Sequence, residues 1–453
     1  MSTSSTTATA DTASDLLNDL IQTALGLGAD AADALMVDGV SLSVSQRLGK
    51  REDLERAEGN DLGLRVFIGK RQAIVSATDT SADTLKELVE RAVAMAKVAT
   101  EDPFCGLADQ ALLAHQWSDL DLYDSHESTA EELYDRAAIA EDAARAHPGI
   151  SNSEGADASW STNNVHLATS HGFSGSYRSS SYSISTAVVA GEGTEMERDY
   201  DYSLSRHLSD LEDPALVGRR AGERTVKRLN PRKAETAQVP VIFDPRISGG
   251  ILGHFASAVT GPAVARGTSF LKDHMDQQVF SPSITLIDDP HRLRGLASKP
   301  FDGEGVSNQE TVLAEAGVLK TWILDSASAR QLGQQTTGHA RRGTSSPPSP
   351  ATTNLYMTPG DPTPDALLET ITSGFYVTEL IGFGVNQVTG DYSRGAAGYW
   401  IEKGEITYPV SEVTIAGNLK DMFMHLTPAN DLEFRYATNA PTLRIDGMTV
   451  AGA

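Results

Sequence analysis

Residues 34–77 read ALMVDGVSLSVSQRLGKREDLERAEGNDLGLRVFIGKRQAIVSA, and this stretch decides the fold of the first half of the chain. Apolar and polar residues alternate along it in short runs, as expected for strands with one buried face. The turn formers between the runs are Asp38-Gly39, Gly49, Gly59-Asn60 and Gly69. They separate runs at 34–37, 42–46, 52–58, 63–68 and 73–77. Because these connections are too short for crossover helices, the stretch predicts an antiparallel meander.

Helical spacing of apolar residues flanks this meander and recurs later in the first half. One predicted helix begins at Ser14, and three others span residues 82–99, 129–146 and 214–229. Between residues 165 and 190, Ser and Tyr alternate with small residues, which indicates further strands with one face toward solvent. We therefore predict an N-terminal α+β domain over residues 14–237, built from an antiparallel sheet with helices.

The second half has many short strand patterns separated by Gly and Pro, and few long helices. The predicted strands are 240–243, 283–287, 312–319, 321–324, 376–381, 397–402, 405–410 and 443–445. This pattern predicts a β-rich, barrel- or sandwich-like domain over residues 238–453. Within it, residues 340–361 contain four prolines and are predicted to form a surface loop.

Residues 1–13 are rich in Ser, Thr and Ala and carry neither a positive charge nor an apolar core. This composition predicts a disordered leader rather than a signal peptide. No apolar run approaches the ~18 residues that a membrane span needs. The single cysteine, Cys105, excludes an intrachain disulfide and is expected to be a small buried apolar residue. We therefore expect a cytoplasmic protein without a membrane partner.

The formal net charge of −24 argues against nucleic acid as a partner. The densest acidic stretch, residues 101–142, holds twelve Asp or Glu and only Arg136 as a positive charge. Binding to a phosphate backbone requires clustered Lys and Arg, and the sequence shows no such cluster.

Common catalytic motifs are missing from the sequence. The glycines of GFGVNQVTG, residues 382–390, do not fit a dinucleotide-binding GxGxxG motif, and Ser393 lacks a surrounding GxSxG motif. No HExxH occurs. The scattered histidines do not have paired ligand spacing, so a self-sufficient metal hydrolase is the weakest hypothesis. They include His166, His171, His274 and His291.

Four segments in fixed order carry a resemblance to a known family. They are TSHGFSGSYRSSSYS (169–183), GLASKPFDGEGV (295–306), TGHARRG (337–343) and GFGVNQVTGDYSRGAAGYWIEKGEITYPVSEVTIAGNLKDMF (382–423). The chain resembles the PmbA/TldE branch of the TldD/PmbA metallopeptidase family from about Ser14 to its C-terminus. The resemblance implies a heterodimer whose TldD-type subunit binds zinc through a helical HExxxH motif and a distant cysteine. It implies hydrolysis of unfolded peptides, including leader segments of modified peptides.

The helix equivalent to the zinc helix reads ISGGILGHFASAVTG, residues 247–261. By this resemblance His254 occupies the first ligand position, Phe255 replaces the glutamate base, and Val259 replaces the second histidine. Catalytic zinc needs three protein ligands, and its water needs a base. The only cysteine lies in the other half of the chain. We therefore expect no catalytic residue and no bound metal in this chain, and zinc in the partner subunit.

A polar cluster follows Gly390, on a predicted turn between strands. Its members Asp391, Tyr392 and Arg394, together with His254, are the candidates for lining a substrate cavity or the partner interface. The alternatives are that the cluster, which includes Ser393, only shapes the turn and that His254 is a structural histidine.

Two functions follow from the resemblance. The first is a non-catalytic TldE/PmbA-type subunit that completes a peptidase chamber and binds extended, unfolded peptide, for example along a strand edge. The alternative is a regulatory protein of the DNA gyrase modulator type, without a proteolytic role.

Overall fold

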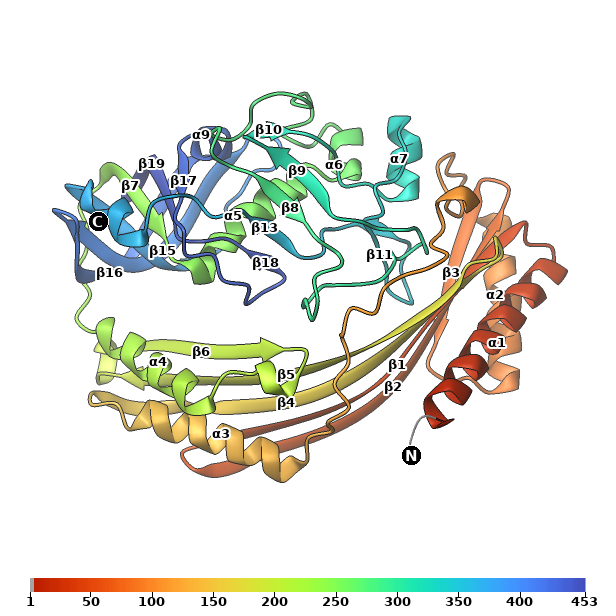
Figure 1. Ribbon diagram of the computed structural model, residues 1–453, viewed down its shortest axis with the longest axis horizontal. Coiled ribbons are helices and arrows are strands. Elements are labelled where there is room, and N and C mark those ends of the chain that lie inside the picture. Colours follow the sequence, from red (N-terminus) through yellow and green to blue (C-terminus); the bar gives the residue numbers. More distant parts are fainter. Residues whose placement is uncertain (1–3, 453) are drawn as a thin grey trace.

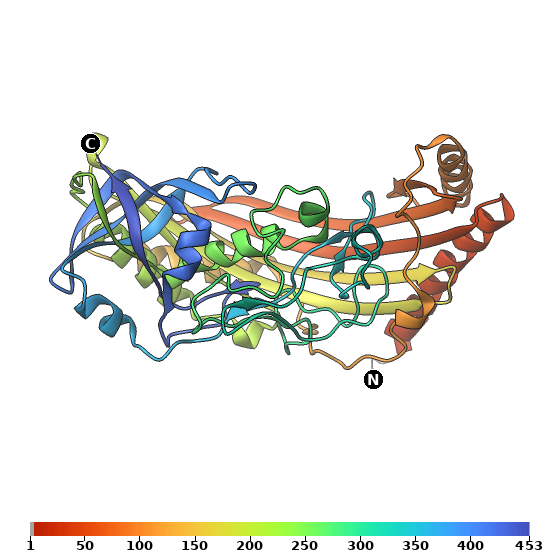
Figure 2. The ribbon, with the colours of Figure 1, turned by 90° about the horizontal axis from the view of Figure 1, so that it is seen from above.

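The computed structural model describes residues 4–452, with side chains described from Ala13 onward. A long curved sheet forms one layer, with helices on its outer face and a second, β-rich domain over its inner face (Figures 1 and 2). The fold is therefore α+β, as the sequence predicts.

The long sheet is antiparallel throughout, with the strand order β3-β2-β1-β4-β5-β6. Its strands are β1 (Ala31–Arg47), β2 (Lys50–Ile68), β3 (Arg71–Ala77), β4 (Ile150–Thr169), β5 (Ser174–Ala190) and β6 (Glu197–Ser205). The predicted turns at Asp38-Gly39 and Gly59-Asn60 are wrong, because Gly39 lies opposite Gly59 within the β1–β2 pair. A Cβ on Gly39 would lie 2.4 Å from the Thr162 carbonyl oxygen, so this glycine permits the close approach of β4.

Helices cover the outer face at both ends of the sheet. They are α1 (Ser4–Gly26) and α2 (Ala82–Val98) at one end, and α3 (Ala130–Arg145) and α4 (Pro214–Lys227) at the other. Helix α1 begins ten residues before its predicted start, so residues 4–13 are helical instead of forming a disordered leader; residues 1–3 lie outside the described residues. Buried Leu17, Leu20 and Ile21 anchor the helix, and its Ser/Thr/Ala-rich first turns continue from that anchored part.

Alternation along β1 buries both faces of the sheet near α1 and α2. Ala34 packs with the core of these helices, whereas its neighbour Leu35 packs with Phe173 and Phe301. Because Phe301 belongs to the second domain, the inner face of the sheet is an interdomain contact.

The C-terminal domain contains a small closed barrel, which confirms the barrel-like prediction. The sheet order is β16-β15-β14-β7-β19-β17, and pairing of β16 with β19 closes five of these strands. The strands are β7 (Ala237–Phe243), β14 (Ser373–Ile381), β15 (Asp391–Glu402), β16 (Glu405–Asn418), β17 (Leu426–Pro428) and β19 (Leu443–Ala451).

A second sheet of the C-terminal domain lies beside the barrel, in the order β10-β9-β8-β13-β18. It comprises β8 (Leu286–Asp288), β9 (Thr311–Glu315), β10 (Val318–Leu319), β13 (Leu355–Met357) and β18 (Thr438–Asn439), and a separate pair is β11 (Ala340–Arg341) with β12 (Ser349–Pro350). The domain's helices are α5 (Pro245–Ala258), α6 (Gly261–Ala265), α7 (Ser326–Leu332), α8 (Pro364–Glu369) and α9 (Leu419–Met424). The predicted surface loop over residues 340–361 is therefore partly wrong. Leu355 and Met357 are fully buried, because β13 pairs with strands on both sides.

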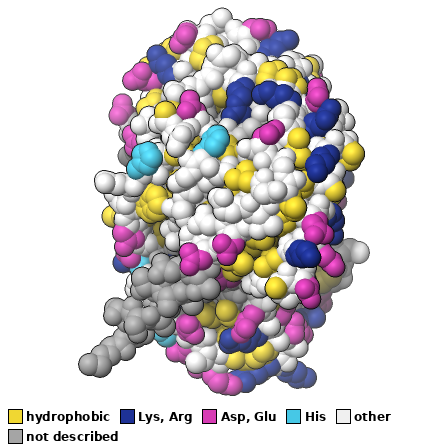
Figure 3. Space-filling model, turned by 90° about the vertical axis from the view of Figure 1, so that its right-hand side faces the viewer, with side chains coloured by type: hydrophobic (Ala, Val, Ile, Leu, Met, Phe, Trp, Pro, Cys, Tyr) yellow, Lys and Arg dark blue, Asp and Glu magenta, His cyan; other side chains and the backbone are white. Residues whose placement is uncertain are grey.

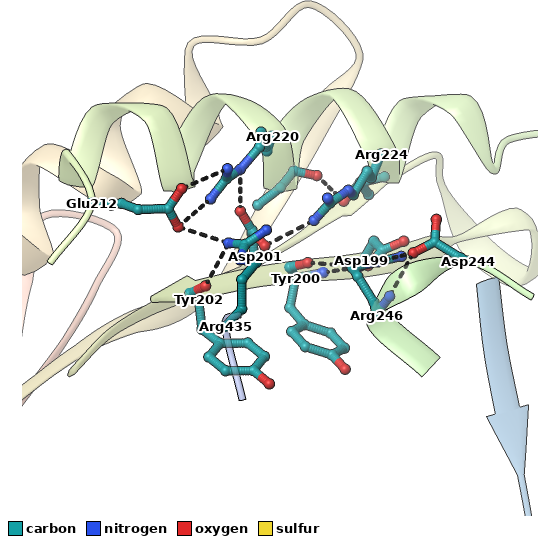
Figure 4. A network of polar contacts seen from close by, with 12 residues as sticks. Asp199, Tyr200, Asp201, Tyr202, Glu212, Arg220, Arg224, Asp244, Arg246 and Arg435 are labelled. Carbon is teal, nitrogen blue, oxygen red and sulfur yellow. Dashed lines mark hydrogen bonds and ion pairs between the residues drawn. The ribbon is translucent and has the colours of Figure 1, made fainter. Parts of the chain in front are cut away.

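An ion-pair network joins β6 and α4 to the C-terminal domain (Figure 4). Buried Asp201 on β6 binds Arg220 and Arg224 of α4. Buried Asp199 binds Arg246 of α5 at 3.2 Å. Separating such a pair would leave a buried charge uncompensated, which costs free energy. The network therefore holds α5 against the sheet.

Helix composition and surface charge bear on the kinds of partner that the sequence analysis considered. Among residues 4–452, no helix combines the length and the apolarity that crossing a bilayer requires. On the face shown in Figure 3, acidic and basic side chains are interspersed, without a broad basic area.

Candidate functional site

Helix α5 carries the positions at which the family resemblance implies a zinc motif. Asp244 caps its N-terminus by accepting a hydrogen bond from the Arg246 backbone N–H at 2.9 Å, and Pro245 occupies the first turn. The Tyr376 hydroxyl donates to Asp244 at 3.1 Å. Since Arg246 also binds Asp199, the start of α5 is held by both the barrel and the long sheet.

The positions of the base and of the second ligand lie in the hydrophobic core. Phe255 and Val259 are both fully buried. The Phe255 ring lies 5.1 Å from the Phe280 ring and 6.3 Å from the Phe423 ring. Val259 is the C-cap residue, already outside the helix. These two positions supply packing and offer no group that could bind a metal or accept a proton.

His254 lies beside two of the predicted site residues on β15. Its ring meets the Tyr392 ring edge-to-face at 5.8 Å. Burial and the positive charge of Arg394 lower the pKa of His254, and burial raises the pKa of Tyr392. Among the described residues, neither the Tyr392 hydroxyl nor Arg394 Nε has a hydrogen-bond partner. The structure thus brings His254, Tyr392 and Arg394 into one polar group.

Asp391 does not join this group. The predicted turn at residues 391–394 is wrong, because β15 begins at Asp391 and its residues alternate between the two faces of the strand. The Asp391 carboxylate accepts hydrogen bonds from Thr389 Oγ1 at 2.6 Å and Asn418 Nδ2 at 3.1 Å, and these bonds lower its pKa. Asp391 therefore orders the preceding loop.

The residues of α5 and its surroundings do not fit a zinc ion. Within residues 4–452, no group of three or more His, Cys, Asp or Glu side chains is arranged to hold a metal. His166 lies 3.7 Å from Asp38, and His291 bonds Asn308. Cys105 packs with Phe67, and burial raises the pKa of its thiol.

Sequence reasoning missed the apolar character of the loop before Asp391, residues 382–390. The exposed fractions are 99% for Phe383 and 55% for Val388, and Ile381, the last residue of β14, is 60% exposed. The loop is nevertheless ordered, because the Ser393 N–H donates to the Gly384 carbonyl at 2.6 Å and Val385 packs against the barrel core. The sequence signal that could have revealed this loop is a set of apolar residues placed among turn-forming Gly, Asn and Thr. Aromatic residues such as phenylalanine are enriched in protein interfaces relative to the rest of the surface.

Comparisons with known proteins identify the family. Models described as the PmbA/TldA metallopeptidase domain 1, central domain and C-terminal domain match residues 32–96, 123–229 and 236–452. The chain is 39% identical to "Metalloprotease PmbA" of Escherichia coli O157:H7, over 96% of both chains. It is 40% identical to "Metalloprotease PmbA homolog" of Haemophilus influenzae, over 94% of both.

Solved structures share the fold over nearly the whole chain. A candidate modulator of DNA gyrase from Bacteroides thetaiotaomicron superposes with a TM-score of 0.89 at 26% identity, covering 97% of this chain and 98% of that one. TldE from Thermococcus kodakarensis superposes with a TM-score of 0.87 at 20% identity, covering 96% and 100%. The family models and the sequence relatives show that the chain belongs to the PmbA/TldE branch of the TldD/PmbA metallopeptidase family.

Proposed function

We propose that this chain is the non-catalytic subunit of a two-chain zinc metallopeptidase that degrades or processes unfolded and modified peptides. The partner is a TldD-type subunit that carries the HExxxH motif and holds the zinc. This chain then completes the chamber around the partner's metal.

The observation that carries the proposal is the burial of Phe255 and Val259 in the core of a metallopeptidase fold. A phenyl ring and an isopropyl group can neither bind zinc nor activate water. A chain of this family with an apolar core at those positions needs a second chain for hydrolysis.

The loop of residues 382–390 supports a partner on this side of the barrel. Phe383 is 99% exposed and sits on the loop that leads into Tyr392 and Arg394. Interfaces of stable complexes bury at least ~1,200 Å² and depend most on a few aromatic anchors. We therefore place the partner contact at this loop, next to the group formed by His254, Tyr392 and Arg394.

The outer edge of β2 is a poor place for peptide binding. Residues 50–59 of this strand are exposed, and β3 pairs only with residues 62–68. The exposed part reads KREDLERAEG, and dense charge on an edge strand opposes pairing with another strand. Extended peptide is therefore expected inside the two-chain chamber.

The test mixes this chain with an HExxxH-bearing family member from the same organism. We expect a 1:1 complex by light scattering after gel filtration, and zinc-dependent cleavage of an unstructured peptide only when both chains are present. Two separate peaks at micromolar concentration, or cleavage by this chain alone, would contradict the proposal.

A second candidate function is regulation of DNA gyrase, favoured by two solved structures of the same fold described as candidate gyrase modulators. The net charge of −24 directs such a role to protein contact rather than DNA contact. Affinity purification distinguishes the two functions, because gyrase captured without a TldD-type chain supports regulation.

A further inference from the structure

A cavity of about 400 Å³ lies between the inner face of the long sheet and the C-terminal domain. Strands β1 and β4 supply an apolar wall that includes Leu35, Val37 and Leu167, and Phe301 extends it from the second domain. The C-terminal domain also contributes polar and charged lining residues, which include Ser298, Lys299, Asp302, Arg341 and Arg342. The volume lies within the usual range for small-ligand pockets.

Two cations in the cavity wall, Arg206 and Lys299, bond main-chain carbonyls and form no ion pair among the described residues. Arg206 donates to the main-chain carbonyls of Ser180 at 3.0 Å, Gly295 at 3.4 Å and Leu296. Lys299 Nζ contacts the Ala340 carbonyl at 3.5 Å. Burial lowers the pKa of both cations. Within the part of the chain that the structure describes, neither forms a salt bridge with Asp or Glu.

Arg342 is buried, and some of its hydrogen-bond donors are unpaired. Its side chain is 1% exposed, and its Nη1 donates to Asp33 Oδ1 at 2.7 Å. Asp33 also binds buried Arg65, so one carboxylate serves two guanidinium groups. Arg342 Nε and Nη2 have no hydrogen-bond partner among the described residues. A buried, unpaired donor is costly, and a charged one more so.

The acid at the cavity does not cancel this positive charge. Asp302 accepts main-chain N–H bonds from Glu304 and Val306 at 2.8 Å and from Ala340 at 3.1 Å, instead of an ion pair. Burial and the nearby Glu304 charge raise the pKa of Asp302 to about 7. Among the described residues that line the cavity, Arg206, Lys299, Arg341 and Arg342 thus stand against the one carboxyl of Asp302.

We propose that this cavity binds a small organic carboxylate, with its oxygens at Arg342 and Lys299 and its apolar body against Leu35, Val37 and Phe301. A planar guanidinium with two free donors matches a carboxylate. The apolar wall favours a ligand with a hydrocarbon part over a bare anion. Two sources share this chemistry: the free C-terminus of a short peptide and a free aliphatic acid. The inference goes beyond the proposed function and concerns this chain alone.

Calorimetry on the isolated full chain tests the site with four probes: N-acetyl-Leu-Leu, its C-terminal amide, 4-methylpentanoate and inorganic phosphate. We expect at least one organic acid to bind, and the amide to bind more than about tenfold more weakly than its parent acid. Tighter binding of the peptide acid identifies a peptide C-terminus as the source, and tighter binding of 4-methylpentanoate identifies a free acid. Binding of neither acid at millimolar concentration, equal binding of acid and amide, or a preference for phosphate overturns the assignment.

Lys299→Met is the matched variant, because it removes the charge and keeps most of the side chain's volume. It should weaken binding of the acid by about tenfold or more. Lys86→Met, on the exposed face of α2, should leave binding unchanged. Equal affinities for the folded Lys299→Met and wild-type chains would overturn the proposal. Because no partner subunit is present, failure here leaves the two-chain peptidase proposal intact.

Discussion

Helix α5 and the interdomain cavity differ in the kind of side chain that they bury, which is apolar at α5 and charged at the cavity. At α5, where the family resemblance implies a degenerate metal motif, Phe255 and Val259 are both fully buried and apolar. At the cavity, no sequence motif predicts a site, yet Arg342 is buried with unpaired hydrogen-bond donors. The difference shows that an inherited site position is weaker evidence for chemistry than unsatisfied polar groups are.

The largest expected effect comes from restoring the motif letters at α5. Phe255→Glu with Val259→His should lower the free energy of unfolding by about 5 kcal/mol, because aromatic packing is lost and an unpaired carboxylate is buried. Denaturant unfolding measures the change. Phe255→Leu is the control, with an expected loss of only about 1 kcal/mol. A stable double variant that binds zinc tightly would show that a third ligand lies close to α5.

The next largest loss of stability is expected at the buried ion pairs of Asp33, beside the cavity. Asp33→Ala should cost about 3–4 kcal/mol, because it leaves Arg65 and Arg342 buried without their shared carboxylate. Asp135→Ala, on the exposed face of α3, should change stability by less than about 0.5 kcal/mol. Equal stabilities of the two variants in urea would mean that the buried ion pairs do not hold the domains together.

A smaller effect is expected at the loop of residues 382–390, where we propose that the partner binds. Phe383→Ser should weaken the complex with the TldD-type subunit by about 2 kcal/mol, or ~30-fold in Kd, without lowering the stability of the free chain. Surface plasmon resonance measures the affinity. Val98→Ser is the matched control, since Val98 is 84% exposed at the end of α2. An unchanged Kd for Phe383→Ser would move the interface away from this loop.

The smallest effect is a pH dependence that separates the two regions. The folded-state pKa of Asp302, about 7, lies above its ordinary value of 3.8, so this carboxyl holds its proton more tightly in the folded chain. Its contribution to stability therefore falls as pH rises from 3.8 to about 7. His254 has a lowered pKa and acts in the opposite sense, losing stability as pH falls below 6.5.

Thermal unfolding at about pH 5.5 and about pH 8 distinguishes these contributions. Asp302→Asn should reduce the stabilisation on the acid side by a few degrees in Tm, and His254→Gln should increase it. Identical pH profiles for Asp302→Asn and the wild type would contradict a proton held at the cavity.

The sequence predicted the fold best where local patterns decide it. Helices α2, α3 and α4 lie within two residues of their predicted bounds, because caps such as Thr129 and Asp213 mark their starts. The predicted breaks in β1 and β2 failed because Gly39 and Gly59 face each other inside a strand pair. Glycine marks both a turn and a close backbone approach, and only the register distinguishes them.

The candidate site was only partly readable from the sequence. Asp391 was grouped with Tyr392 and Arg394, because a strand's alternation cannot be recognised when the segment is taken for a turn. The cavity was missed because Leu35, Arg206, Lys299 and Arg342 come together only through the packing of two domains. Nothing in their spacing along the chain predicts that they meet.

The zinc content of the two chains, purified separately and as a complex, tests the central claim most directly. The account predicts no stoichiometric zinc in this chain alone and about one zinc per heterodimer, lost when the partner's HExxxH histidines are replaced. Elemental analysis of protein prepared without chelators measures this ratio. One tightly held zinc in this chain alone would contradict the proposal that the buried Phe255 and Val259 leave the chemistry to a partner.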